Sequence, residues 1–165
     1  MAVISLKGQK VNTNGSLPAA GSKAPVFFLT DKDLKDVSLK DFPGRTLVLN
    51  IFPSLDTSTC AASVRRFNEI AGSKGNSAVL CISRDLPFAQ ARFCGAEGLK
   101  NVITLSEMRT LDFGEKYGLR ITDSPLKGLL ARAVVIIDNQ GKIIYTQLVP
   151  EIASEPDYEA ALKFI

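Results

Sequence analysis

The sequence holds three cysteines, Cys60, Cys81 and Cys94, and no histidine. Without histidine, Ser-His-Asp and Cys-His catalysis, the HExxH zinc motif and histidine-ligated haem are excluded. Three thiols alone do not complete the four-coordinate site of a structural zinc ion. An odd number of cysteines also does not fit a framework of structural disulfides. The chemistry that remains is that of a cysteine working without histidine.

Cys60 follows an apolar run and a proline-containing loop, and it lies in the first turn of a predicted helix. The N-terminus of a helix carries a partial positive charge and free N–H groups, so it favours an anionic thiolate. Chemistry also gathers at the carboxyl ends of strands in α/β sheets. These features predict a nucleophile at Cys60. The alternative is a small residue that only packs the first helical turn.

The other two cysteines differ in their surroundings. Cys81 lies inside an apolar strand-like run, where a free cysteine acts as a small hydrophobic residue, so we predict a packing role. Cys94 ends a short predicted helix just before Gly95. Alone it is a helix-end residue that touches the core. A sulfenic acid at Cys60 could condense with it if the two Cα atoms came within about 7 Å.

The composition bounds the class of protein. The chain has 165 residues, 45% hydrophobic and 22% charged, which predicts a single globular domain over residues 1–165. The net charge is only +3, and the largest basic cluster is the pair Arg65–Arg66. Both observations argue against binding of nucleic acid. No apolar run resembles a secretory signal or a membrane span. We therefore expect a cytoplasmic protein with free thiols that binds no membrane.

Strand-like and helix-like segments alternate along the chain. Nearly continuous apolar runs predict central strands buried on both faces. Apolar residues at helical spacing predict helices in the segments between them. The predicted strands are Val3–Leu6, Gln9–Asn12, Val26–Leu29, Leu47–Phe52, Ala78–Ser83, Val102–Leu105, Ala133–Asp138 and Lys142–Val149. The predicted helices are Cys60–Ala71, Pro87–Cys94, Met108–Tyr117 and Tyr158–Phe164. This order predicts an α/β, thioredoxin-like fold: a central mixed sheet flanked by helices, with an N-terminal β-hairpin extension.

The segment around Cys60 resembles a known active site. Pro53 to Cys60 has the form Pro-x-x-x-Thr-x-x-Cys, which resembles the active-site motif of the peroxiredoxins. Longer segments are similar to the bacterial thiol peroxidases, the atypical two-cysteine subfamily; they span residues 50–68, 85–98, 125–135 and 155–162. The resemblance therefore extends over nearly the whole chain.

The resemblance implies roles for individual residues. Cys60 would be the peroxidatic nucleophile, and Cys94 the resolving cysteine of the same chain. Thr57 would hydrogen-bond the thiolate and the peroxide, and Pro53 would shield the thiolate from bulk water. Cys81 has no catalytic role in this scheme.

Arg132 would hold the thiolate and the developing charge. It is distant from Cys60 in sequence, but topology can bring the two together. If strand 133–138 runs antiparallel to strand 47–52, its start lies at the sheet end where residue 52 exits. A guanidinium with fixed donors suits an anionic sulfur and a peroxide oxygen.

The family also implies a cycle and its partners. A hydroperoxide, either hydrogen peroxide or an organic one, would oxidise Cys60 to a sulfenic acid, and Cys94 would convert it to an intrachain disulfide. Thioredoxin would reduce that disulfide, and the protein would be a homodimer. No metal, flavin or haem is needed, because sulfur does the redox work. Disulfide formation is expected to loosen Thr57–Ala62 and Pro87–Gly95, since both cysteines lie in helical segments.

Two other functions fit parts of the sequence. A thiol–disulfide oxidoreductase acting on proteins uses the same fold, but the chain lacks its CxxC motif. A binding or chaperone-like module would carry only incidental thiols, and it predicts an unreactive Cys60.

Overall fold

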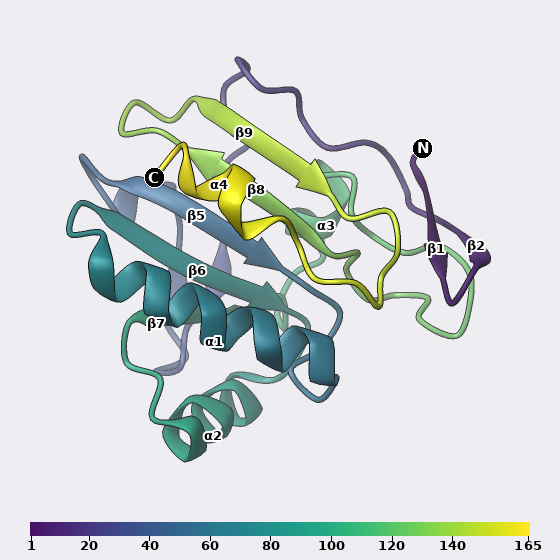
Figure 1. Cartoon of the computed structure of the whole chain (residues 1–165), viewed down its shortest axis with the longest axis horizontal. Coiled ribbons are helices and arrows are strands. Elements are labelled where there is room, and N and C mark those ends of the chain that lie inside the picture. Colours follow the sequence, from purple (N-terminus) through teal and green to yellow (C-terminus); the bar gives the residue numbers. More distant parts are fainter.

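The computed structural model describes residues Met1–Ile165, and its centre is a seven-stranded mixed sheet (Figure 1). The strand order across the sheet is β4-β3-β7-β6-β5-β8-β9. These strands are β3 (Leu29–Thr30), β4 (Asp36–Val37), β5 (Thr46–Ile51), β6 (Ser77–Ser83), β7 (Val102–Ser106), β8 (Ala133–Ile137) and β9 (Ile143–Leu148). The helices are α1 (Ser58–Ser73), α2 (Pro87–Glu97), α3 (Asp112–Lys116) and α4 (Tyr158–Leu162), with a short 3-10 helix at Leu39–Asp41.

The central strands determine where the site lies. β5 runs parallel to β6 and antiparallel to β8, and β8 and β9 pair as the predicted antiparallel hairpin. Ile51, the last residue of β5, lies opposite Ala133, the first residue of β8. Arg132 therefore stands at the sheet end where β5 leads into the loop before Cys60, as the sequence predicted.

Each face of the sheet carries its own apolar core. Alternate residues of β5, β6 and β8 point to opposite faces, so Leu47 and Leu49 belong to one core while Val48 belongs to the other. The first core includes Phe113 of α3 and is closed by segments from the N-terminal part of the chain. The second lies under α1 and α4, which cover that face together (Figure 1). Burial on both faces explains why these strands read as continuous apolar runs.

The predicted N-terminal hairpin is confirmed as β1 (Val3–Leu6) paired antiparallel with β2 (Gln9–Asn12). Glu151 anchors it: its carboxylate accepts hydrogen bonds from the Ser5 hydroxyl at 2.7 Å and from the Lys7 N–H at 2.9 Å. These bonds lower the pKa of Glu151 to about 2. The hairpin is thus attached to the loop that follows β9.

Three predicted elements differ from the structure. The strand predicted at Val26–Leu29 is wrong in position, because Val26 and Phe28 are half exposed and pairing begins only at Leu29. The third helix is shorter than Met108–Tyr117. Helix α2 does not end at Cys94; it continues to Glu97 and stops at Gly98, whose φ of 68° gives the left-handed cap that glycine accepts readily.

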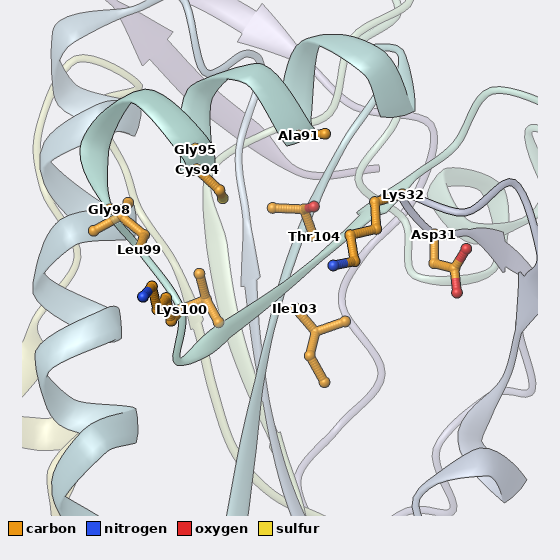
Figure 2. Close-up of a pocket in the computed structure, with 11 residues that line it drawn as sticks. Asp31, Lys32, Ala91, Cys94, Gly95, Gly98, Leu99, Lys100, Ile103 and Thr104 are labelled. Atoms are coloured by element: carbon orange, nitrogen blue, oxygen red, sulfur yellow. The ribbon is translucent and has the colours of Figure 1, made fainter.

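The outer edge of β7 is largely open. β3 pairs with β7 only through Thr30 and Ser106, so the rest of β7 has no strand on that side. A groove of about 560 Å³ runs there between β7 and the C-terminal half of α2 (Figure 2). No helix in the structure is long and apolar enough to span a bilayer.

Candidate active site

Helix α1 places Cys60 in its first turn, with Thr57 as the N-cap. The Thr57 hydroxyl oxygen accepts a hydrogen bond from the Cys60 N–H at 3.3 Å, which satisfies one of the free N–H groups of the helix start. Cys60 is fully buried, with no exposed surface. The thiol therefore lies beside the positive end of α1 and away from bulk water.

Arg132 contacts the sulfur of Cys60 directly. Its Nη2 donates to Cys60 Sγ at 3.3 Å, and its Nε donates to the Ile152 carbonyl at 2.8 Å. The residue is 2% exposed, yet its Nη1 has no hydrogen-bond partner. A buried donor without a partner is costly. The guanidinium thus offers spare N–H groups to an oxygen atom that arrives next to the sulfur.

Thr57 and Pro53 lie around the same thiol, with one difference from the expected geometry. The Thr57 hydroxyl donates to the Ser54 carbonyl at 3.1 Å, so in this state its proton is not directed at the sulfur. Pro53 is buried and directly follows Phe52 at the exit of β5. Thr57 therefore serves the helix N-terminus here, and its contact with thiolate or peroxide stays a prediction.

Cys94 lies on α2 and points into the groove beside β7, near Lys32 and Thr104 (Figure 2). It is partly exposed, in contrast to Cys60. Burial raises the pKa of the Cys94 thiol, and the nearby Lys32 ammonium opposes that rise. Cys94 is therefore the thiol of this site that is accessible from the surface.

Cys60 and Cys94 are free and lie apart. Cys94 lines the groove on β7, whereas Cys60 is held by Arg132 beside β8, and β6 and β5 lie between those strands. The two thiols therefore have separate surroundings and form no disulfide in this state. The structure brings Arg132 and Cys60 together but leaves Cys94 separate.

Cys81 lies in the middle of β6 with no exposed surface, and Asn50 Nδ2 approaches its sulfur at 3.7 Å. Burial raises the pKa of Cys81 to about 12. The observed burial agrees with the predicted packing role.

We therefore expect iodoacetamide to modify Cys94 and to leave Cys81 untouched in the folded, reduced protein. Cys81 has no exposed surface, and burial raises the pKa of its thiol, so neither contact with the reagent nor ionisation at pH 8 is favoured. Mass spectrometry after alkylation checks this, with urea-unfolded protein, in which all thiols react, as the control. Equal labelling of Cys81 and Cys94 in the folded state would contradict it.

One further residue of the site, Asp85, was not predicted, although it begins the segment 85–98 that resembles the thiol peroxidases. Its carboxylate accepts hydrogen bonds from the Ser54 hydroxyl at 2.7 Å, the Leu55 N–H at 2.8 Å and the Ser83 hydroxyl at 2.6 Å. Ser54 and Leu55 belong to the loop that leads to Cys60. An aspartate before Leu-Pro is ordinary at a helix start, so only the three-dimensional contact shows its importance.

The family model described as Redoxin matches residues 19–162. The chain belongs to the Redoxin family. This redoxin is 57% identical over 162 residues to the thiol peroxidases of Mycobacterium bovis and Mycobacterium tuberculosis, a match that covers 98% of this chain and 97% of each relative. A solved structure, the peroxiredoxin-like protein from Aquifex aeolicus, superposes with a TM-score of 0.93 at 40% identity and covers 99% of this redoxin and 95% of the other chain.

These comparisons confirm the predicted family and the thioredoxin-like α/β fold with its N-terminal hairpin. They also confirm the class of enzyme, a thiol-dependent peroxidase. The roles of individual residues in this redoxin rest on its own geometry.

Proposed function

We propose that this redoxin reduces hydrogen peroxide and organic hydroperoxides at Cys60, and that Cys94 resolves the oxidised sulfur as an intrachain disulfide. A thioredoxin-type dithiol then reduces the disulfide. The observation that carries the proposal is the buried Arg132–Cys60 contact of 3.3 Å together with the unpartnered Nη1 of the same guanidinium.

The first step needs a sulfur anion and a place for two oxygen atoms. The Cys60 thiolate attacks one oxygen of the hydroperoxide, and the O–O bond breaks. Sulfur gains that oxygen and loses two electrons, and the second oxygen leaves as an alcohol or water after taking a proton. Arg132 is suited to this step because its Nη2 holds the sulfur while its remaining N–H groups can stabilise charge on the oxygens.

Thr57 and Pro53 have supporting roles in this proposal. The Thr57 hydroxyl, which donates to Ser54 at rest, turns its proton toward the bound peroxide or the sulfur. Pro53, buried beside the end of β5, excludes water from the thiolate. Exclusion of water strengthens the interaction between Arg132 and the sulfur.

The second step joins the two cysteines. The Cys94 thiolate attacks the sulfur of the sulfenic acid, the S–O bond breaks, and water leaves. A dithiol protein of the thioredoxin type then takes over the disulfide by thiol–disulfide exchange, and both cysteines return as thiols. Partial exposure of Cys94 supports its place in this exchange, because Cys60 is fully buried.

The homodimer and the cellular compartment are also part of the proposal. The Ser106 hydroxyl donates to the Asp85 carbonyl, and exposed apolar side chains follow both residues closely in the sequence: Leu86 and Phe88 after Asp85, Met108 and Leu111 after Ser106. Such side chains are typical of a surface between subunits. Three thiols that form no disulfide framework fit the cytoplasm, which is reducing.

A peptide map prepared without reductant tests the cycle. After one equivalent of hydrogen peroxide, we expect a Cys60–Cys94 crosslink with Cys81 still free. The Cys94→Ser variant should stop at an unlinked Cys60 sulfenic acid, which dimedone traps, and Cys60→Ser should show neither product.

Different results would change different parts of the proposal. An oxidised but unlinked Cys60 in the unaltered protein would remove the resolving role of Cys94. An unreacted Cys60 thiol would overturn the peroxidase site itself. A protein that reacts poorly with peroxide but rapidly exchanges with protein disulfides would instead be a thiol–disulfide oxidoreductase.

A further inference from the structure

We propose that Asp85 is a positioning residue that holds the Cys60 loop in its peroxide-reducing conformation and couples that loop to the helix that carries Cys94. The inference rests on the proposed function. The release of Asp85 from the loop sets what share of oxidised Cys60 becomes a disulfide and what share becomes a sulfinic acid.

The carboxylate of Asp85 joins two segments that are distant in sequence. From the Cys60 loop it accepts the Ser54 hydroxyl at Oδ1 and the Leu55 N–H at Oδ2, at 2.7 and 2.8 Å. From the end of β6 it accepts the Ser83 hydroxyl at 2.6 Å. Asp85 takes part in no ion pair of the structure. The hydrogen-bond donors to its carboxylate are therefore neutral hydroxyl and N–H groups, and hydrogen bonds to a carboxylate are the strong ones.

A continuous path of hydrogen bonds leads from Asp85 to the nucleophile. Ser54 donates its hydroxyl to Asp85, and its carbonyl accepts the Thr57 hydroxyl at 3.1 Å. The Thr57 oxygen in turn accepts the Cys60 N–H at 3.3 Å. Loss of the Ser54–Asp85 bond leaves Ser54 free to move, and Ser54 is the residue that orients Thr57, the N-cap of α1. Asp85 thus acts on Cys60 through Ser54 and Thr57 and touches no reacting atom.

The same aspartate is also attached to α2. Asp85 lies two residues before Pro87, the first residue of the helix, and its carbonyl accepts the Ser106 hydroxyl at 2.6 Å. Gln90 of α2 is fully buried and donates to Ser83 Oγ at 3.2 Å, the hydroxyl that binds Asp85. The loop before Cys60 and the helix of Cys94 therefore meet at one small polar cluster.

The cluster has opposite effects on the two steps of the cycle. While it is closed, Cys60 stays beside Arg132, where it reacts with peroxide. Cys60 and Cys94 have separate surroundings in that state, so we expect release of the loop before the disulfide forms. A sulfenic acid that is held in place can instead react with a second hydroperoxide, which transfers an oxygen to sulfur, gives a sulfinic acid and leaves as an alcohol or water. Asp85 thus speeds the first oxidation of Cys60. It also slows disulfide formation, and so increases the share of Cys60 that is overoxidised to the sulfinic acid.

A graded pair of variants tests this. Asp85→Ala removes all acceptors of the side chain, and Asp85→Asn keeps its shape without the charge. We expect Cys60 of Asp85→Ala to be oxidised about tenfold more slowly, because loss of one hydrogen bond to a charged group has an effect of about that size. It should also need about tenfold more peroxide for half-conversion to the sulfinic acid, because the disulfide forms sooner. Asp85→Asn should fall between it and the unaltered protein in both measurements.

The chain contains no tryptophan, so the reaction is best followed by quenching with an alkylating reagent and mass spectrometry. The matched control is Asp123→Asn, since Asp123 also accepts a backbone N–H and a side-chain donor, both from Asn12. Ser54→Ala removes the loop side of the contact. Combined with Asp85→Ala it should add little, because both changes break the same bond.

The partition between disulfide and sulfinic acid separates positioning from a merely structural role. A variant that only lost folded protein would react in smaller amount but with an unchanged ratio of products. An unchanged ratio in Asp85→Ala and Ser54→Ala overturns the inference. If Asp85→Ala does not fold, Asp85→Asn and Ser54→Ala carry the same test. Failure of the unaltered protein to oxidise at Cys60 would be a failure of the proposed function instead.

Discussion

Replacing Arg132 with lysine is expected to slow the oxidation of Cys60 by hydrogen peroxide about 100- to 1000-fold, the usual cost of a lost charge-stabilising donor. Lysine keeps the positive charge but lacks the planar fork. One ammonium cannot hold the Ile152 carbonyl through Nε, hold Cys60 Sγ through Nη2 and still offer Nη1 to an oxygen. The large effect therefore comes from lost geometry and not from lost charge.

The rate of Cys60 oxidation, measured by timed alkylation and mass spectrometry, checks this prediction. Arg109→Lys is the matched control, because Arg109 makes an exposed ion pair with Asp36. Such a pair contributes little, so we expect this control to react like the unaltered protein. A rate for Arg132→Lys within about threefold of the control would show that charge alone suffices.

Disulfide formation is expected to raise hydrogen exchange strongly in α2, by at least about tenfold, and less in the first turn of α1. The two helices differ in how well they are packed. α1 buries six residues, Cys60, Ala61, Ser63, Val64, Phe67 and Ile70, whereas α2 buries only Pro87 and Gln90. Unwinding of α2 exposes fewer buried side chains than unwinding of α1, so it costs less free energy. We therefore expect Cys94 to move further than Cys60 when the disulfide forms.

Exchange measured by mass spectrometry on the reduced and peroxide-treated protein tests this. Peptides from Thr57–Ala62 and Pro87–Glu97 should gain deuterium after oxidation, and those from β6 should not. The Cys94→Ser variant treated in the same way is the control, since it cannot form the disulfide. Unchanged exchange in both helical segments would contradict the required unwinding.

The central part of the fold could be predicted from the sequence because its signals are local. β5, β6 and β8 are buried on both faces, so each appears as an apolar run. The contact between Arg132 and Cys60 was implied by the resemblance to the peroxiredoxins. Antiparallel pairing of β5 and β8 makes it possible, because it sets which strand ends coincide.

Other features depend on contacts that no local pattern reveals. The short strands β3 and β4 have two residues each, too few for any periodicity. The approach of Lys32 to Cys94 depends on where the chain between those two strands lies. Asp85 binds residues about 30 positions earlier in the chain, and nothing around it distinguishes a loop anchor from an ordinary helix-start aspartate. Long-range polar contacts of this kind become visible only in three dimensions.

The open edge of β7 bears on how copies of this protein avoid sticking to each other. An unpaired edge strand with β-branched residues such as Val102 and Ile103 is a template for intermolecular β-pairing, the route to aggregation. Here that edge borders a groove lined by Lys32 and Lys100 together with Asp31, and not a flat surface. Charged side chains and an uneven surface at a sheet edge both hinder strand-to-strand docking of a second copy. The groove beside Cys94 can therefore stay open without being a flat template for β-pairing.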